Sequence, residues 1–122
     1  MAKILVAEDS ITDLQFIKSA LKETSHEIIT ASDGEEAEQK ARSEAVDLIV
    51  LDVVMPKKSG FQVCRALKKD EKFKHIPIIM LTSKSQESDR FWGLKQGADE
   101  YITKPVEPID LLLAIKKHLM RV

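Results

Sequence analysis

Short apolar runs that alternate with segments of helical periodicity constrain the fold of this chain more than any other feature of its sequence. We predict strands at residues 3–7, 27–31, 48–52, 77–81 and 100–103. We predict helices that begin near residues 10, 33, 60, 85 and 108, the fourth running to about Gln96. Strict alternation of this kind is typical of parallel strands joined by right-handed crossovers. The sequence therefore predicts an α/β fold, a doubly wound five-stranded parallel sheet flanked by five helices.

The length and composition of the chain fit a single globular domain. Its 122 residues suffice for one hydrophobic core, and we expect one domain over residues 1–122 with no output domain attached. The net charge is -1 and the basic residues are scattered, which gives no basis for a nucleic-acid partner. The apolar stretch Ile4–Ala7 is too short for a signal peptide or a membrane span, so we expect a cytoplasmic protein without membrane insertion.

The few cysteine and histidine residues point to neither a disulfide nor a zinc site. Cys64 is the single cysteine, which fits a reducing compartment. Its position on the apolar face of a predicted helix favours a small buried side chain over a redox role. The histidines lie far apart in the sequence without the spacing of metal ligands, so we expect no zinc site at His26, His75 or His118.

Apolar residues at helical spacing predict which helix faces are buried. In the first helix we expect a face made of Ile11, Leu14, Ile17 and Leu21, widened by Phe16 and Ala20. In the last helix we expect Leu112, Ile115 and Leu119 to face the core. Trp92 in the fourth helix either covers the edge of the sheet or stands exposed for a partner, and the first alternative is favoured.

Four of the predicted strands end in, or are directly followed by, polar residues: Glu8–Asp9, Asp52, Thr82 and Lys104. The carboxyl ends of parallel strands meet at one edge of a sheet, which is where ligands of open α/β folds bind. If the first and third strands are neighbours, three carboxylates crowd together and raise one another's pKa unless a cation lies among them. Carboxylate oxygens at a partly open edge suit Mg²⁺, which keeps waters and shares its coordination shell with phosphate.

A divalent ion beside a free carboxylate, a hydroxyl and an ammonium is the equipment of phosphoryl transfer. Asp52 would be the nucleophile and would form an acyl phosphate. Lys104 would pair with phosphate oxygens, and Thr82 would donate a hydrogen bond to one of them. Each residue alone also has a structural explanation, since Glu8–Asp9 precede a helix and favour its dipole, Asp52 and Thr82 could cap loops and Lys104 could be a surface lysine.

Five segments together carry a resemblance to a known family: Glu8–Asp9, Asp52–Pro56, Gly60, Thr82–Ser83 and Gly97–Pro105. With this set, the chain as a whole resembles the receiver domain of two-component response regulators. The resemblance implies the strand order 2-1-3-4-5. It also implies that Asp52 accepts a phosphoryl group from a histidine kinase or histidine phosphotransfer domain. The metal ligands would be Asp9, Asp52 and the backbone carbonyl of Val54, with Glu8 assisting through water.

Further roles follow from the same resemblance. The Lys104–Pro105 peptide bond would be cis. Thr82 and Tyr101 would form a switch, in which Tyr101 turns inward when phosphate recruits the Thr82 hydroxyl. The switch would alter the surface of the fourth helix, fifth strand and fifth helix, where a downstream protein target would bind. Val54 and Lys84 would border the path of the hydrolytic water and so tune the lifetime of the phosphorylated state.

Two questions of function stay open at the level of the sequence. Details such as Trp92–Gly93, Gln96–Ala98 and Lys104–Val106 look most like the stand-alone twitching-motility regulators of the PilG/PilH type. The protein would catalyse its own phosphorylation and dephosphorylation rather than turn over an external substrate. The alternative is a pseudo-receiver, a binding module that works without phosphorylation.

Overall fold

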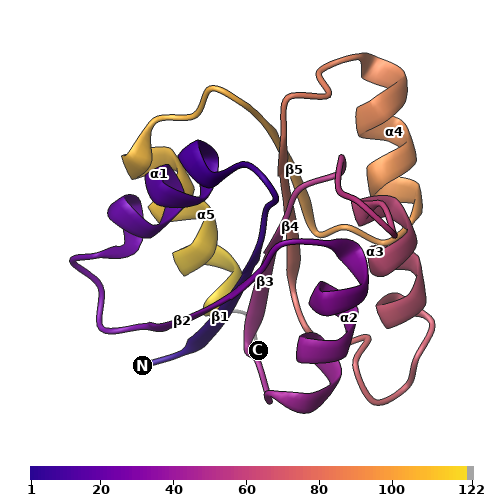
Figure 1. Cartoon of the computed structure of the whole chain (residues 1–122), viewed down its shortest axis with the longest axis horizontal. Helices are drawn as coiled ribbons and strands as arrows, with labels where there is room; N and C mark the ends of the chain where they lie inside the picture. Colours follow the sequence, from indigo (N-terminus) through magenta and orange to yellow (C-terminus); the bar gives the residue numbers. More distant parts are fainter. Residues whose placement is uncertain (121–122) are drawn as a thin grey trace.

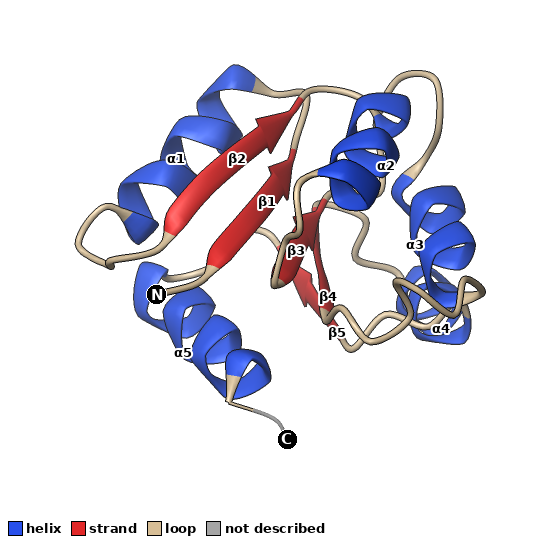
Figure 2. Ribbon diagram, turned by 90° about the horizontal axis from the view of Figure 1, so that it is seen from below, coloured by secondary structure: helices blue, strands red, loops and turns tan. Residues whose placement is uncertain are grey.

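The computed structural model describes residues 1–120, and within them five parallel strands form one sheet. The strands are β1 (Lys3–Ala7), β2 (Glu27–Ala31), β3 (Leu48–Leu51), β4 (Ile78–Thr82) and β5 (Glu100–Thr103). Their order across the sheet is β2-β1-β3-β4-β5, and every neighbouring pair is parallel (Figures 1 and 2). The predicted doubly wound α/β fold and the strand order 2-1-3-4-5 are therefore confirmed.

Helices fill the connections between the strands and follow the last one. They are α1 (Ile11–Leu21), α2 (Gly34–Ser43), α3 (Gly60–Lys68), α4 (Glu87–Lys95) and α5 (Pro108–Leu119). Helices α1 and α5 cover one face of the sheet, and α2, α3 and α4 lie on the opposite side (Figure 1). The fourth helix is shorter than the predicted span, because its first turn starts only at Glu87, after the cap residue Gln86.

The strands contribute alternate side chains to two separate hydrophobic cores, one on each face of the sheet. In β1, Ile4 and Val6 pack with α1 and α5, whereas Leu5 and Ala7 pack with α2 and α3. All four of these side chains are buried. Burial on both faces explains why the strands read as continuous apolar runs rather than as an alternation of apolar and polar residues.

Polar residues just before three of the helices fix where those helices begin. Ser10, Asp33 and Ser59 each accept a hydrogen bond from the backbone N–H three residues further on. The accepted bonds satisfy N–H groups that have no partner within the first turn of a helix. At Ser59 the Gln62 side chain also accepts from the Ser59 backbone N–H, which completes a reciprocal capping box.

The predicted buried face of α1 is too wide. Ile17 and Leu21 are buried, but Ile11 is 75% exposed and Phe16 is 38% exposed. Ile11 is the first residue of α1 and follows the loop after β1, so it lies beyond the end of the strand that would cover it. Helix α1 therefore contacts the sheet through a narrower stripe than its apolar residues suggest.

The predicted core face of α5 is displaced by about one residue. Leu111, Ala114, Ile115 and His118 are buried, whereas the predicted Leu112 and Leu119 are only partly buried. The imidazole of His118 completes the buried stripe because its Nε2 lies 2.6 Å from Glu100 Oε1. A buried polar group needs such a partner, and the partner comes from β5, which sequence periodicity does not reveal.

Trp92 is more exposed than the favoured edge-packing alternative predicts. Its side chain is 48% exposed. The neighbouring Gly93 faces the sheet instead, with Tyr101 directly against it.

Within residues 1–120, no helix is both long enough and apolar enough to span a bilayer.

Candidate functional site

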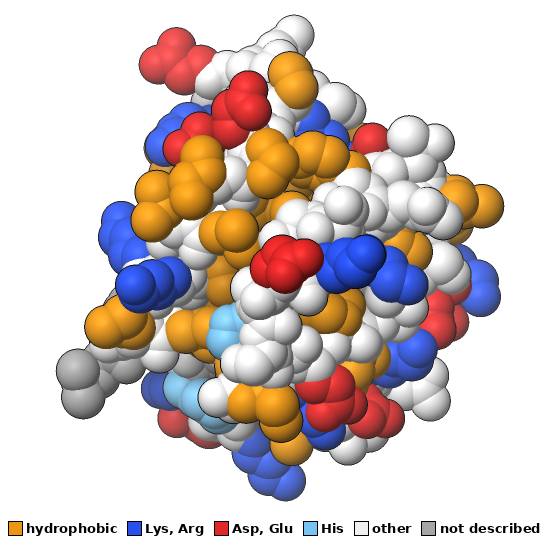
Figure 3. Space-filling view, turned by 90° about the vertical axis from the view of Figure 1, so that its left-hand side faces the viewer, with side chains coloured by type: hydrophobic (Ala, Val, Ile, Leu, Met, Phe, Trp, Pro, Cys, Tyr) orange, Lys and Arg blue, Asp and Glu red, His pale blue; other side chains and the backbone are white. Residues whose placement is uncertain are grey.

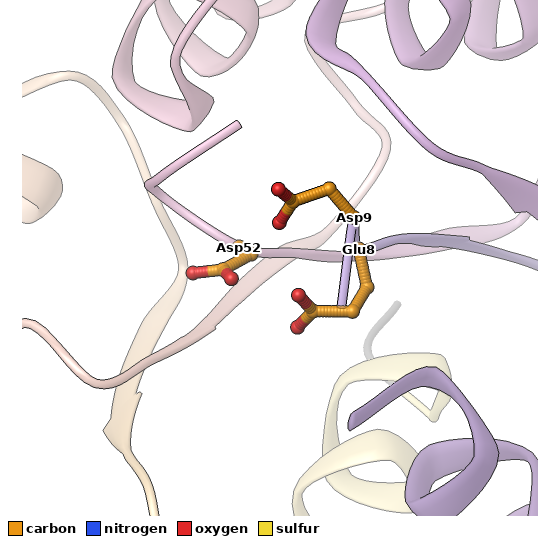
Figure 4. Close-up of side chains that lie close together, drawn as sticks. All are labelled: Glu8, Asp9 and Asp52. Atoms are coloured by element: carbon orange, nitrogen blue, oxygen red, sulfur yellow. The ribbon is translucent and has the colours of Figure 1, made fainter. Parts of the chain in front are cut away.

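The pairing of β1 with β3 brings the predicted acidic residues together at the carboxyl edge of the sheet. Ala7 and Leu51 are register partners, so the residues that follow these two strands lie side by side. One carboxylate oxygen from each of Glu8, Asp9 and Asp52 lies within 4.8 Å of the others. Figure 4 shows the three carboxylates converging on one space. Within residues 1–120 this is the one cluster of at least three acidic, histidine or cysteine side chains with such spacing.

The three carboxylates differ in their exposure to solvent. Glu8 is 2% exposed and Asp52 is 7% exposed, whereas Asp9 is exposed. The cluster therefore has buried oxygens on one side and an open side toward water. A hard divalent cation that retains part of its hydration shell fits such a donor set, because it prefers oxygen ligands and dehydrates reluctantly.

The backbone around Asp52 holds its carboxylate in place. Asp52 Oδ1 accepts hydrogen bonds from the backbone N–H of Val53 at 2.7 Å and, more weakly, of Val54 at 3.4 Å. Gly60 at the start of α3 packs directly on this turn, and a Cβ atom there would lie 2.1 Å from the backbone oxygen of Asp52. The Gly60 N–H donates to Val53 O at 2.8 Å. A glycine is therefore required at position 60, because the backbone at the start of α3 lies too close to the backbone of Asp52 and Val53 for any side chain.

Lys104 enters the acidic cluster from the loop after β5. Its Nζ lies 2.6 Å from Glu8 Oε1, 2.8 Å from Asp13 Oδ2 and 3.5 Å from Asp52 Oδ2. The Lys104–Pro105 peptide bond is cis, as the resemblance implied. Sequence reasoning placed Lys104 at this edge but missed Asp13. The available signal was its position in the first turn of the helix that follows Glu8–Asp9.

Crowding and burial perturb the ionisation of this cluster. Burial raises the pKa of Glu8 from 4.5 to about 7, and the neighbouring Asp52 carboxylate adds to the increase, although hydrogen bonds from Lys104 and Ser10 oppose it. Burial alone would lower the pKa of Lys104, but its hydrogen bonds with Asp13 and Glu8 outweigh burial and raise it. The site thus holds a protonated ammonium among carboxylates that it does not fully neutralise.

The predicted switch residues lie on the neighbouring strands β4 and β5, where Thr82 pairs with Thr103 and Tyr101 pairs with Met80. Thr82 is fully buried, and its Oγ1 accepts a hydrogen bond from the Lys84 N–H at 3.2 Å. Tyr101 is 2% exposed and its hydroxyl donates to Lys84 O at 2.7 Å. Tyr101 therefore already occupies the inward orientation that the sequence analysis expected only after phosphorylation. The absence of a side chain at Gly93 leaves room for its ring.

The two predicted lifetime-tuning residues lie at the surface near Asp52 and Thr82. Val54 is 53% exposed, and the Lys84 side chain is also exposed. Val54 follows Asp52 by two residues, and Lys84 follows Thr82 by two. Both positions are accessible to water.

Comparisons with known proteins agree with this architecture. The family model described as "Response regulator receiver domain" matches residues 4–116. Protein PilH of Pseudomonas aeruginosa is 41% identical over 119 residues, with 98% of each chain covered. The alkaline phosphatase synthesis transcriptional regulatory protein PhoP of Bacillus subtilis is 44% identical over 119 residues, but the present chain spans only 49% of its length.

A solved structure extends the comparison to three dimensions. The CheY-like response regulator receiver domain protein of Methanospirillum hungatei superimposes with a TM-score of 0.90 at 29% sequence identity. The match covers 98% of this chain and 94% of the other. From its sequence, its sheet order and its structural similarity, the chain belongs to the response regulator receiver domain family.

Proposed function

We propose that Asp52 is the phosphoacceptor of a two-component phosphorelay. The observation that carries the proposal is the convergence of Glu8, Asp9 and Asp52 with the ammonium of Lys104 at one open edge of the sheet. An oxygen of the Asp52 carboxylate would attack the phosphorus of a phosphohistidine on a histidine kinase or histidine phosphotransfer domain. The P–N bond would break, the new O–P bond would form, and the leaving imidazole would take up a proton.

The residues at this edge suit Mg²⁺ as the cofactor of the transfer. Asp9, Asp52 and the backbone carbonyl of Val54 would hold the ion, and Glu8 would contact it through water. The ion would neutralise charge on the phosphoryl oxygens. Lys104 would pair with a phosphoryl oxygen, and the Thr82 hydroxyl would donate a hydrogen bond to another. The alternative function is binding without phosphorylation.

Labelling with acetyl phosphate and Mg²⁺ tests the proposal. We expect incorporation at Asp52 alone, abolished by Asp52→Asn and by EDTA. Asp47→Asn is the matched control, because Asp47 lies just before the opposite end of β3 and should leave labelling intact. A phosphate mapped by mass spectrometry to another residue, or labelling undiminished in EDTA, would show that the assignment is wrong.

We further propose that phosphorylation is read out by a protein partner at the surface of α4, β5 and α5. Helix α4 presents the exposed side chains of Phe91, Trp92 and Leu94. Arg90 donates from its guanidinium to Tyr101 O at 2.8 Å, which ties this helix to β5. A shift in the population of the Thr82–Tyr101 arrangement would therefore change the α4 surface.

Helices α1 and α5 carry further exposed apolar side chains. Figure 3 shows hydrophobic side chains gathered over the side of the molecule that carries α1 and α5, and Ile11, Ile109 and Leu113 are among the exposed apolar residues of these helices. On addition of beryllofluoride, we expect NMR shift changes from Thr82 to Tyr101 and in α5. Changes restricted to the immediate surroundings of Asp52 would contradict the proposed switch.

The side chains at positions 54 and 84 should lengthen the lifetime of the aspartyl phosphate. The Val54 side chain has no hydrogen-bonding group that could orient a water, and a lysine ammonium offers donors but no acceptor for a proton of water. We expect Val54→Asn combined with Lys84→Glu to accelerate dephosphorylation by about tenfold, or about 1.4 kcal/mol in barrier height. Decay of purified phosphorylated protein measures this rate. An unchanged or slower decay would show that these residues do not control it.

The similarity to PilH supports a role in motility control of the twitching type, which we propose as the pathway. Deletion of the gene in its native host should then alter surface motility, and the Asp52→Asn variant should fail to restore it. The match over residues 4–116 also supports one receiver domain across this chain.

A further inference from the structure

The ammonium of Lys104 lies closer to two other carboxylates than to Asp52. The Nζ–oxygen distances are 2.8 Å to Asp13 and 2.6 Å to Glu8, against 3.5 Å to Asp52. An ammonium has three N–H donors, and the two short contacts occupy two of them. Lys104 is therefore held mainly by residues other than the proposed phosphoacceptor.

We propose that Asp13 is a positioning residue that holds the Lys104 ammonium back from Asp52 and so limits how readily the site takes up a phosphoryl group. The proposal rests on the function proposed above for Asp52 and Lys104. It adds a residue that belongs neither to the acidic cluster of Glu8, Asp9 and Asp52 nor to the Thr82–Tyr101 pair.

Burial indicates which of the two short contacts gives way. The side chain of Glu8 is 1% exposed and that of Asp13 is 43% exposed. Breaking the contact with Asp13 leaves its carboxylate in water, whereas breaking the contact with Glu8 leaves a buried carboxylate without its cation, which costs much more. When a phosphoryl group forms on Asp52, Lys104 turns to it by releasing Asp13.

The local structure makes Asp13 suitable for substitution. The start of α1 is held by the Ser10 hydroxyl, which accepts from the backbone N–H of Asp13 at 3.2 Å. This contact uses only the backbone of Asp13, so a change of its side chain leaves the helix cap in place. The Asp13 carboxylate is also outside the group of oxygens that would bind the metal.

The test compares Asp13→Asn with the control Asp110→Asn. Asp110 lies in the first turn of α5, as Asp13 does in α1, so both substitutions remove a charge that favours a helix dipole. In Asp13→Asn, labelling by acetyl phosphate with Mg²⁺ should be about threefold faster and beryllofluoride should bind about threefold more tightly, the order expected for a partly exposed ion pair. Asp110→Asn should match the wild type, and Asp13→Glu should restore slow labelling.

A Lys104→Ala background distinguishes positioning from a general effect of charge. If Asp13 acts through Lys104, Asp13→Asn has no further effect on beryllofluoride affinity once Lys104 is gone. An equal gain in both backgrounds would overturn the proposal, because the gain would then reflect only reduced repulsion of the anion. If the wild type is labelled and Asp13→Asn is labelled no faster, the positioning role of Asp13 is overturned, but the proposed phosphoacceptor role of Asp52 is not. A wild type that neither takes up label nor binds beryllofluoride would overturn both.

Discussion

Glu8 is expected to destabilise the metal-free protein at neutral pH, and replacing it with glutamine should remove the effect. Its carboxyl group is buried next to Asp52, which raises its pKa from 4.5 to about 7. An acid with a raised pKa in the folded state is ionised more easily in the unfolded chain. Between pH 4.5 and about pH 7, the two pKa values, Glu8 keeps its proton in the folded protein and loses it in the unfolded chain. The free energy of unfolding therefore falls as pH rises through this range.

The size of the effect follows from the shift. Each pKa unit corresponds to about 1.4 kcal/mol, so the change from 4.5 to about 7 amounts to about 3 kcal/mol of stability lost by pH 8. The hydrogen bond with Lys104 opposes the increase in the pKa of Glu8 but does not cancel it. Glutamine has nearly the same shape and no charge. Glu8→Gln should therefore match the wild type near pH 4 and exceed its stability at pH 8 by up to about 3 kcal/mol.

Urea denaturation in EDTA from pH 4 to pH 8 measures this difference. Glu87→Gln, at an exposed position in the first turn of α4, is the control and should change little. Addition of Mg²⁺ should stabilise the wild type more than Glu8→Gln, because the cation offsets the repulsion that the substitution removes. A Glu8→Gln variant that is less stable than the wild type at pH 8 without metal would refute the reasoning.

Three further predictions concern residues packed around the site and the core. Gly60→Ala should cost about 2–3 kcal/mol in urea denaturation, because its new methyl group would meet the rigid backbone of Asp52. Gly93→Ala should cost less, about 1 kcal/mol, since the side chain of Tyr101 can move aside, and NMR should show that ring becoming exposed. Burial raises the pKa of the Cys64 thiol to about 12, so stability should fall as pH rises above 9, and a thiol reagent should react only after unfolding.

Local sequence determined most of the fold. Continuous apolar runs, without alternation of apolar and polar residues, indicated strands that are buried on both faces. Ser10, Asp33 and Ser59 indicated where three helices begin. Both signals depend only on residues that are close in the sequence. The polar residues after the strands marked the site edge, since the carboxyl ends of parallel strands converge whatever their exact register. The placement of Glu8, Asp9, Asp52 and Lys104 could therefore be predicted without coordinates.

Contacts between distant segments needed the tertiary structure. The ion pair of Asp13 with Lys104 joins residues 91 apart, and the pair of His118 with Glu100 shifted the buried face of α5. The widely separated His26, His75 and His118 all line one hollow of about 710 Å³. The orientation of Tyr101 depends on Gly93 in another element.

The local sequence thus determined which segments form strands and helices and where three of the helices begin, because these properties are set by neighbours along the chain. Packing decided which polar side chain each buried charge contacts, because an ammonium with several carboxylates in reach is placed by distance and burial in three dimensions. That choice placed Lys104 nearer to Asp13 than to Asp52.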